Sequence, residues 1–146
     1  MRYGLIGEKL GHSFSKIIHE QLADYTYDLI PLTRDELDAF LREKQFSALN
    51  VTIPYKETVI PYLDEVDNRA QKIGAVNTVV NRDGRLIGHN TDGFGFFASL
   101  KNFNPKDTHI MILGAGGAAK SIVTQAVLDG AKKVSIYVRP QSLVKA

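Results

Sequence analysis

Two short stretches of the chain carry residue types that could do chemistry. In the run GAGGAA, Gly114, Gly116 and Ala119 match the spacing G-x-G-x-x-G/A. Glycines at this spacing let a backbone turn tightly and let a phosphate approach the peptide N–H groups at the start of a helix. In the run ALNVTIPYKET, Lys56 places a cation just after what reads as a buried strand. The first stretch therefore predicts an anion-binding loop, and the second raises the question of what the cation does.

The elements around the glycine run give it a mechanism. The apolar run HIMIL precedes it, a stretch with Ile122, Ala126 and Val127 on one helical side follows it, and VSIYV reads as the next strand. A glycine turn between a strand and a helix of a βαβ unit is typical of dinucleotide binding, although a merely tight turn is the alternative. The loop residues expected to hold the pyrophosphate are Gly114, Ala115, Gly116, Gly117, Ala118 and Ala119.

The end of the next strand indicates which dinucleotide binds. An acidic residue there would accept hydrogen bonds from the ribose 2′-hydroxyl of NAD, whereas this chain has Arg139. A guanidinium offers a fixed positive charge and planar donors, which suit a 2′-phosphate. The sequence therefore favours NADP, with NAD possible, while a solvated arginine at a strand end is the alternative interpretation.

Composition and charge exclude several classes of function. The chain has 146 residues, 44% of them hydrophobic, and a net charge of only +2 without a Lys/Arg run, so nucleic acid is not expected as a partner. It has no cysteine for a disulfide or a thiolate metal site, and its histidines lack zinc-hydrolase spacing, so no metal is expected. No apolar run reaches the roughly 20 residues that span a bilayer, and the N-terminus lacks a signal-peptide pattern. We expect a cytoplasmic protein.

The order of the expected elements predicts an α/β fold. Strands alternate with helices from residue 3 onward, Thr33 and Glu36 form a capping box, and a helical stretch interrupted at Pro61 is expected over residues 59–74. Asp83 and Gly84 predict a hairpin, which adds an antiparallel pair to an otherwise parallel sheet.

We therefore expect a three-layer α/β substrate domain with a mixed sheet over residues 1–103. The first βαβ unit of a Rossmann-type, NAD(P)-binding domain is expected over residues 104–146.

Four motifs in order, LNVTIPYK, GAVNTVV, NTDGFGF and GAGGAA, together with GHSFSKIIHE near the N-terminus, resemble the shikimate dehydrogenase family. The resemblance covers nearly the whole chain. It implies reversible, NADP-dependent oxidation of shikimate to 3-dehydroshikimate in aromatic amino acid biosynthesis. Quinate is the alternative substrate, and a catalytically inactive, substrate-binding fragment of such an enzyme is the alternative function. Folate dehydrogenases and tRNA-linked glutamate reductases share the cofactor fold but do not explain these motifs.

The resemblance also implies roles for individual residues. Lys56 and Asp92 are expected to act together as a proton relay on the substrate hydroxyl. Ser13 and Ser15 are expected to bind the substrate carboxylate. The ring hydroxyls are expected to contact Asn50, Thr52, Asn77 and Asp92. Taken singly, each serine could instead cap a helix, and each amide or hydroxyl could be an ordinary strand or turn residue.

The chain departs from the family pattern at two places. Family members commonly carry Asn-Arg-Thr where this chain has Val138, Arg139 and Pro140, with Ser142 as a possible substitute hydroxyl. This leaves NADP against NAD, and shikimate against quinate, open. The cofactor part also ends after two strands, so we expect a truncation within the cofactor domain. Its bare apolar surface predicts a homodimer or other self-association through the incomplete Rossmann half.

Overall fold

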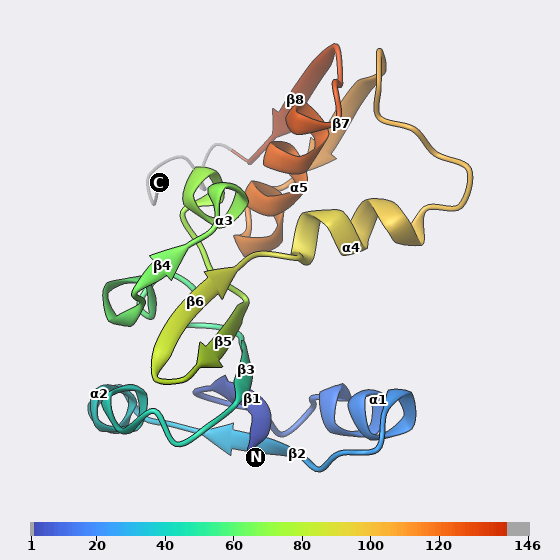
Figure 1. Cartoon of the computed structure of the whole chain (residues 1–146). Coiled ribbons are helices and arrows are strands. Elements are labelled where there is room, and N and C mark those ends of the chain that lie inside the picture. The colour runs from blue at the N-terminus through green and yellow to red at the C-terminus, as the bar shows by residue number, and fades with distance from the viewer. Residues whose placement is uncertain (1, 140–146) are drawn as a thin grey trace. The chain divides into compact units, whose positions relative to one another are not determined.

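The computed structural model describes residues 2–139, which form two compact units divided after Asn90 (Figure 1). The strands of the first unit are β1 (Tyr3–Gly7), β2 (Tyr27–Pro31), β3 (Ala48–Val51), β4 (Glu65–Val66), β5 (Thr78–Arg82) and β6 (Arg85–His89). Its helices are α1 (Ser15–Leu22), α2 (Arg34–Glu43), the 3-10 helix η1 (Ile60–Tyr62) and α3 (Asn68–Ile73). The second unit contains α4 (Asp92–Ser99), β7 (His109–Leu113), α5 (Gly117–Leu128) and β8 (Lys133–Tyr137).

The six strands of the first unit form one mixed sheet in the order β2-β1-β3-β5-β6-β4. Strand β1 is parallel to β2 and β3, whereas β5 is antiparallel to β3 and β6. The hairpin between β5 and β6 turns at Asp83 and Gly84, whose φ angles of 52° and 86° are those of the tight turn that such a dipeptide favours. The predicted mixed sheet and its hairpin are confirmed.

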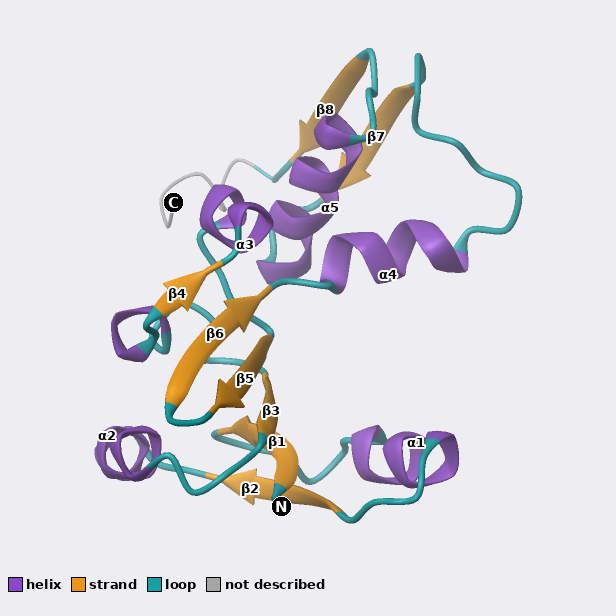
Figure 2. Ribbon diagram, viewed as in Figure 1, coloured by secondary structure: helices purple, strands orange, loops and turns teal. Residues whose placement is uncertain are grey.

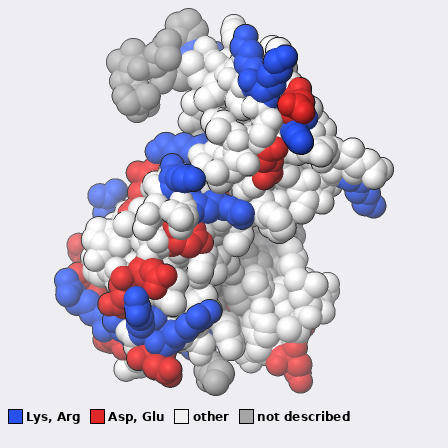
Figure 3. All heavy atoms as spheres, turned by 45° about the horizontal axis from the view of Figure 1, so that its top comes forward, with Lys and Arg blue, Asp and Glu red and all other residues white. Residues whose placement is uncertain are grey.

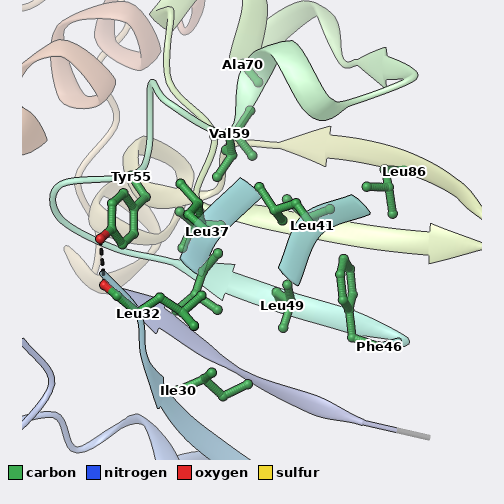
Figure 4. Close-up of a cluster of buried hydrophobic side chains, with 14 residues drawn as sticks. Ile30, Leu32, Leu37, Leu41, Phe46, Leu49, Tyr55, Val59, Ala70 and Leu86 are labelled. Carbon is green, nitrogen blue, oxygen red and sulfur yellow. Dashed lines mark hydrogen bonds between the residues drawn. The ribbon is translucent and has the colours of Figure 1, made fainter. Parts of the chain in front are cut away.

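The sheet of the first unit lies between α2 and α1, which makes this unit three-layered (Figure 2). Successive side chains of a strand point to opposite faces, and two separate apolar clusters are buried. One layer contains Ile6 and Val51 from the sheet with Leu37 and Leu41 from α2, all buried. Tyr55 belongs to this layer, and its hydroxyl donates a 2.6 Å hydrogen bond to the Leu32 carbonyl oxygen (Figure 4).

The opposite face of the sheet carries Leu5 and Tyr27, and α1 contacts β1 and β2 there. The Lys16 ammonium of α1 donates to the Tyr27 carbonyl oxygen at 2.8 Å, and the His19 ring stacks on the Tyr27 ring. The predicted three-layer α/β architecture is thus confirmed for this unit.

Helix α2 begins at the capping box that the sequence predicts. The Thr33 hydroxyl accepts a hydrogen bond from the Glu36 amide, and the Glu36 carboxylate accepts one from the Thr33 amide at 2.8 Å. The exchange satisfies two amides that have no partner inside the helix.

The segment over residues 59–74 is not one interrupted helix, so that expectation was wrong. Glu65 and Val66 instead form β4, which pairs with Ile87 and Gly88 of β6. Asp67 then starts α3 by accepting a 2.7 Å hydrogen bond from the Ala70 amide. A pairing distant in sequence and a local cap together override the helical spacing of the apolar residues.

The second unit has the predicted βαβ arrangement, in which β7 and β8 are parallel and α5 connects them. Its compact part begins at Thr91 instead of near residue 104, because α4 packs on α5 through Gly93. The division at 103/104 therefore does not coincide with the compact units, and it remains a prediction about domain organisation. Within residues 2–139, no helix is long and apolar enough to cross a membrane.

Candidate functional site

The predicted substrate residues of the first unit lie around the carboxyl ends of β1 and β3, which are adjacent parallel strands. The Thr52 amide donates a 2.9 Å hydrogen bond to the Ile6 carbonyl oxygen. A side chain at Gly7 would place its Cβ 2.6 Å from the Thr52 methyl group. The loop that follows β1 therefore starts beside Thr52, at the edge where ligands of parallel sheets bind.

Ser13 and Ser15, which the resemblance assigns to the substrate carboxylate, are coupled to each other on that loop. Both are half-buried, the two hydroxyls are 3.1 Å apart, and the Ser13 hydroxyl accepts a hydrogen bond from the Ser15 amide at 3.2 Å. The N-cap residue of α1 is Phe14, which makes no side-chain cap, so the Ser13 hydroxyl satisfies the first amide of the helix from the residue before it. The pair presents two hydroxyl groups together, as an anionic oxygen would require.

Lys56 is positioned by its neighbours on both sides. Tyr55, fully buried, anchors the turn after β3, and its amide donates to the Thr52 carbonyl oxygen at 2.9 Å. The Val76 amide then donates to the Lys56 carbonyl oxygen at 2.8 Å. The half-buried Lys56 therefore lies on a segment joined to the one that carries Asn77.

Asn50 and Asn77 are linked through Thr78. The Asn50 amide nitrogen donates to the Thr78 hydroxyl at 3.3 Å, and that hydroxyl donates to Asn77 Oδ1 at 3.1 Å. Asn50 also accepts a 2.6 Å hydrogen bond from the Tyr27 hydroxyl. The sequence did not single out Tyr27 or Thr78, although Thr78 lies within the motif GAVNTVV that carries Asn77.

Asp92 belongs to the second unit, where it is the first residue of α4. It is half-buried, and Gly93 follows it directly. The structure thus links the side chains of Asn50 and Asn77 through Thr78, and it joins the main-chain segments of Lys56 and Asn77. The loop of Ser13 and Ser15 begins beside Thr52, and Asp92 lies on the unit that carries the glycine loop.

The glycine loop has the geometry of a phosphate cradle. Gly114 has a φ of 105°, which favours glycine, and its amide is bound to the Tyr137 carbonyl oxygen at 2.8 Å. Gly116 is the N-cap residue of α5. A Cβ at either glycine would meet no atom within 4 Å, so neither glycine is needed for internal packing. The open space lies at a helix N-terminus, where amides point outward, and it fits a pyrophosphate.

Arg139 lies at the other side of this loop. It lines a cavity of about 450 Å³ together with Gly114, Ala115, Tyr137 and others, and it is exposed. A cation in this position fits a phosphate group on the adenosine side of a dinucleotide. Pro140 and Ser142, which the sequence analysis also considered, lie outside the described residues.

Charge over the chain is mixed. Figure 3 shows Lys and Arg side chains interspersed with Asp and Glu side chains on the face that it draws. Within the part of the chain that the structure describes, no group of three or more His, Asp or Glu side chains gathers as a metal site would require. The donor groups of the candidate site are hydroxyls, amides and one ammonium, which suit an oxygen-rich organic ligand.

Comparison with known proteins identifies the family of the chain. Residues 5–79, about half of the chain, match the family model described as the shikimate dehydrogenase substrate binding domain. A shikimate dehydrogenase (NADP(+)) of Streptococcus thermophilus is 63% identical over 150 aligned residues, which cover 97% of this chain and 53% of that protein. The chain thus spans about half the length of the curated relatives it matches.

Solved structures are similar over nearly the whole chain. A shikimate 5-dehydrogenase from Listeria monocytogenes, in complex with shikimate and NAD, has a TM-score of 0.88 and 38% identity, covering 96% of this chain and 52% of that one. A shikimate 5-dehydrogenase from Thermus thermophilus, in complex with NADP(H) and shikimate, has a TM-score of 0.84 and 33% identity, covering 99% and 59%. By its matched residues and its fold, the chain belongs to the shikimate dehydrogenase family.

Proposed function

We propose that this chain is the substrate-binding unit, and the first part of the cofactor unit, of an NADP-dependent shikimate dehydrogenase. The observation that carries the proposal is the joining of the Lys56 segment to the Asn77 segment at the carboxyl ends of the parallel strands. It supports the proposal because the main-chain segment of Lys56, the one cation of the set, is joined to the segment that carries the Asn77 amide. The oxidation of a polyhydroxylated ring acid needs a proton acceptor together with donors and acceptors for the ring hydroxyls. The relatives named shikimate dehydrogenase (NADP(+)) support the same substrate and cofactor.

In this proposal the residues of the first unit bind and orient the substrate. The hydroxyls of Ser13 and Ser15 donate to the carboxylate of shikimate. The amides of Asn50 and Asn77 and the hydroxyl of Thr52 bind its ring hydroxyls. Because the ring carries several donors and acceptors, a set of fixed amides and hydroxyls fixes its orientation as well as its affinity.

Lys56 and Asp92 are proposed to remove the proton of the substrate hydroxyl. Oxidation of the 3-hydroxyl removes a hydride from carbon and a proton from oxygen, and the proton needs a base within hydrogen-bond reach. We assign its transfer to Lys56, with Asp92 as the second member of the relay. Lys56 belongs to the first unit and Asp92 to the second. The role of each residue is therefore tested by a separate substitution.

NADP, when bound, supplies the hydride acceptor. Gly114, Gly116 and the first amides of α5 would hold the pyrophosphate, and Arg139 would bind the 2′-phosphate. The NAD complex of the Listeria relative keeps NAD as the alternative cofactor.

The test is reduction of NADP by shikimate with the purified chain, followed by the absorbance of the reduced nicotinamide. Lys56→Met and Asp92→Asn should each lower the rate by about a hundredfold or more, the usual contribution of a general acid–base group. Turnover that neither substitution changes would overturn the assignment. Shikimate binding without turnover in a folded sample would leave the chain as a substrate-binding half whose chemistry needs further residues.

A further inference from the structure

A continuous chain of side-chain hydrogen bonds crosses the sheet of the first unit. The Tyr27 hydroxyl of β2 donates to Asn50 Oδ1 of β3 at 2.6 Å, passing over β1, which lies between those strands. Asn50 Nδ2 donates to the Thr78 hydroxyl of β5 at 3.3 Å. The Thr78 hydroxyl donates to Asn77 Oδ1 at 3.1 Å. Two predicted substrate residues are thus joined through two residues that the substrate prediction does not include.

The donor and acceptor in each of these hydrogen bonds fix the orientation of the side-chain amides of Asn50 and Asn77. The oxygen and nitrogen of an Asn side chain have nearly the same shape, so only their partners decide which is presented on which side. The Thr78 hydroxyl has one proton, which it gives to Asn77, and it can therefore only accept from Asn50. Asn50 must then turn its nitrogen toward Thr78 and its oxygen toward Tyr27.

The first donor of the chain is itself held in place. Tyr27 is 2% exposed, and its ring stacks on the His19 ring with centroids 4.0 Å apart and planes 10° apart. Burial raises the pKa of the Tyr27 hydroxyl, so it remains a protonated donor at physiological pH. His19 in turn shares a hydrogen bond with the neighbouring Tyr25 hydroxyl, which is outside the chain of bonds.

Three of the hydrogen-bonded residues also line a cavity. Tyr27, Asn50 and Thr78 line a cavity of about 320 Å³ on the α1 face of the sheet. We propose that Tyr27 and Thr78 are positioning residues, which hold the amides of Asn50 and Asn77 in one orientation for a polyhydroxylated ring acid. This inference rests on the proposed function, because it concerns the same substrate site.

Four variants separate positioning from packing. Thr78→Val removes the hydroxyl and keeps the shape, whereas Thr78→Ser keeps the hydroxyl and removes a methyl group. Tyr27→Phe removes the first donor. Tyr25→Phe is the matched control, because Tyr25 contacts the same aromatic cluster and gives no bond to either amide.

The first readout needs no ligand. The side-chain amide resonances of Asn50 and Asn77 in the ¹H–¹⁵N spectrum of the chain report their orientation and exchange. Thr78→Val should shift both pairs of resonances and speed their hydrogen exchange, while Thr78→Ser and Tyr25→Phe should retain them. Unchanged amide resonances in Thr78→Val would overturn the inference, whether or not the chain binds shikimate.

The second readout is the dissociation constant for shikimate, measured by calorimetry. Ordering a side chain costs about as much free energy as a three- to tenfold change in affinity, so Thr78→Val and Tyr27→Phe should weaken binding by roughly that factor. Thr78→Ser should bind like the parent chain. Weak binding in Thr78→Ser as well would overturn a role of the hydroxyl, and failure of the unaltered chain to bind would count against the proposed function alone.

Discussion

Gly93 of α4 lies directly against the main chain of Ser121 in α5, with no room between them for a side chain. A Cβ on Gly93 would contact the Ser121 carbonyl oxygen and lie 2.7 Å from Gln125 Cβ. Gly95, two residues further on the same helix, has nothing within 4 Å of the equivalent point. Because Asp92 precedes Gly93, this contact ties Asp92 to the helix that starts at the glycine loop.

Gly93→Ala should therefore destabilise the second unit. Forcing a methyl group into a filled contact typically costs about 1–3 kcal/mol of unfolding free energy. Gly95→Ala is the control, and it should leave stability unchanged or raise it by up to about 1 kcal/mol, since alanine favours helix more than glycine does. Urea unfolding, monitored by hydrogen exchange of the amides of α4 and α5, measures the stability of both variants. Equal effects of the two substitutions would contradict the packing account.

Arg139 should decide between the two dinucleotides. Arg139→Ala should raise the dissociation constant for NADP by about tenfold, because a charged hydrogen bond to the 2′-phosphate is lost. The same substitution should leave the dissociation constant for NAD unchanged. Lys133→Ala, at the other end of β8, should change neither constant. Equal weakening of both dinucleotides in Arg139→Ala would show that the guanidinium does not read the 2′-phosphate.

The capping box of α2 should make the unfolding free energy of the chain depend on pH in the acidic range. Hydrogen bonds from the Thr33 amide and hydroxyl hold the pKa of Glu36 below its ordinary value of 4.5. A lowered carboxyl pKa contributes stability that is present above about pH 4.5 and is lost as pH falls through the lower, folded value. Glu36→Gln keeps the cap acceptor without titrating. The unfolding free energy of the unaltered chain should therefore fall relative to Glu36→Gln below about pH 4.5, and parallel pH profiles would contradict this.

The exposed side chains of the two-stranded sheet should promote self-association. Met111 and Leu113 of β7 are 72% and 77% exposed, and bare apolar strand surface tends to pair. Sedimentation velocity over a concentration series should show species larger than the monomer, and Leu113→Lys should reduce them. Leu22→Lys, at an equally exposed site on α1, is the control and should leave them. A monodisperse monomer at high concentration would contradict the prediction.

Much of the fold could be predicted because its signals are local. The capping box at Thr33, the hairpin at Asp83 and the glycine turn at Gly114 each depend on backbone preferences of a few adjacent residues. The failure at Glu65 and Val66 has the opposite cause, since β4 exists through pairing with β6, some 20 residues away in sequence. The apolar spacing there fits a helix, and only the tertiary contact decides against it.

The residues of the candidate site also separate into those with a local sequence signal and those that depend on contacts distant in sequence. Lys56 and Asn77 lie within recognisable motifs, so the family resemblance located them. Tyr27 is one of six tyrosines, and no local pattern relates it to Asn50, because the bond between them spans a strand and depends on the strand order. The extent of the compact units was also not predictable, since it depends on the contact that Gly93 makes with α5.

The most direct test of the central claim, that the chain binds shikimate through these residues, is calorimetric titration of the folded chain with shikimate and with its methyl ester. We expect saturable binding of one shikimate per chain. The ester, which lacks the anionic charge, and the double variant Ser13→Ala/Ser15→Ala should each weaken binding by about tenfold or more. No binding by a folded chain, or equal affinity for shikimate and its ester, would contradict the account.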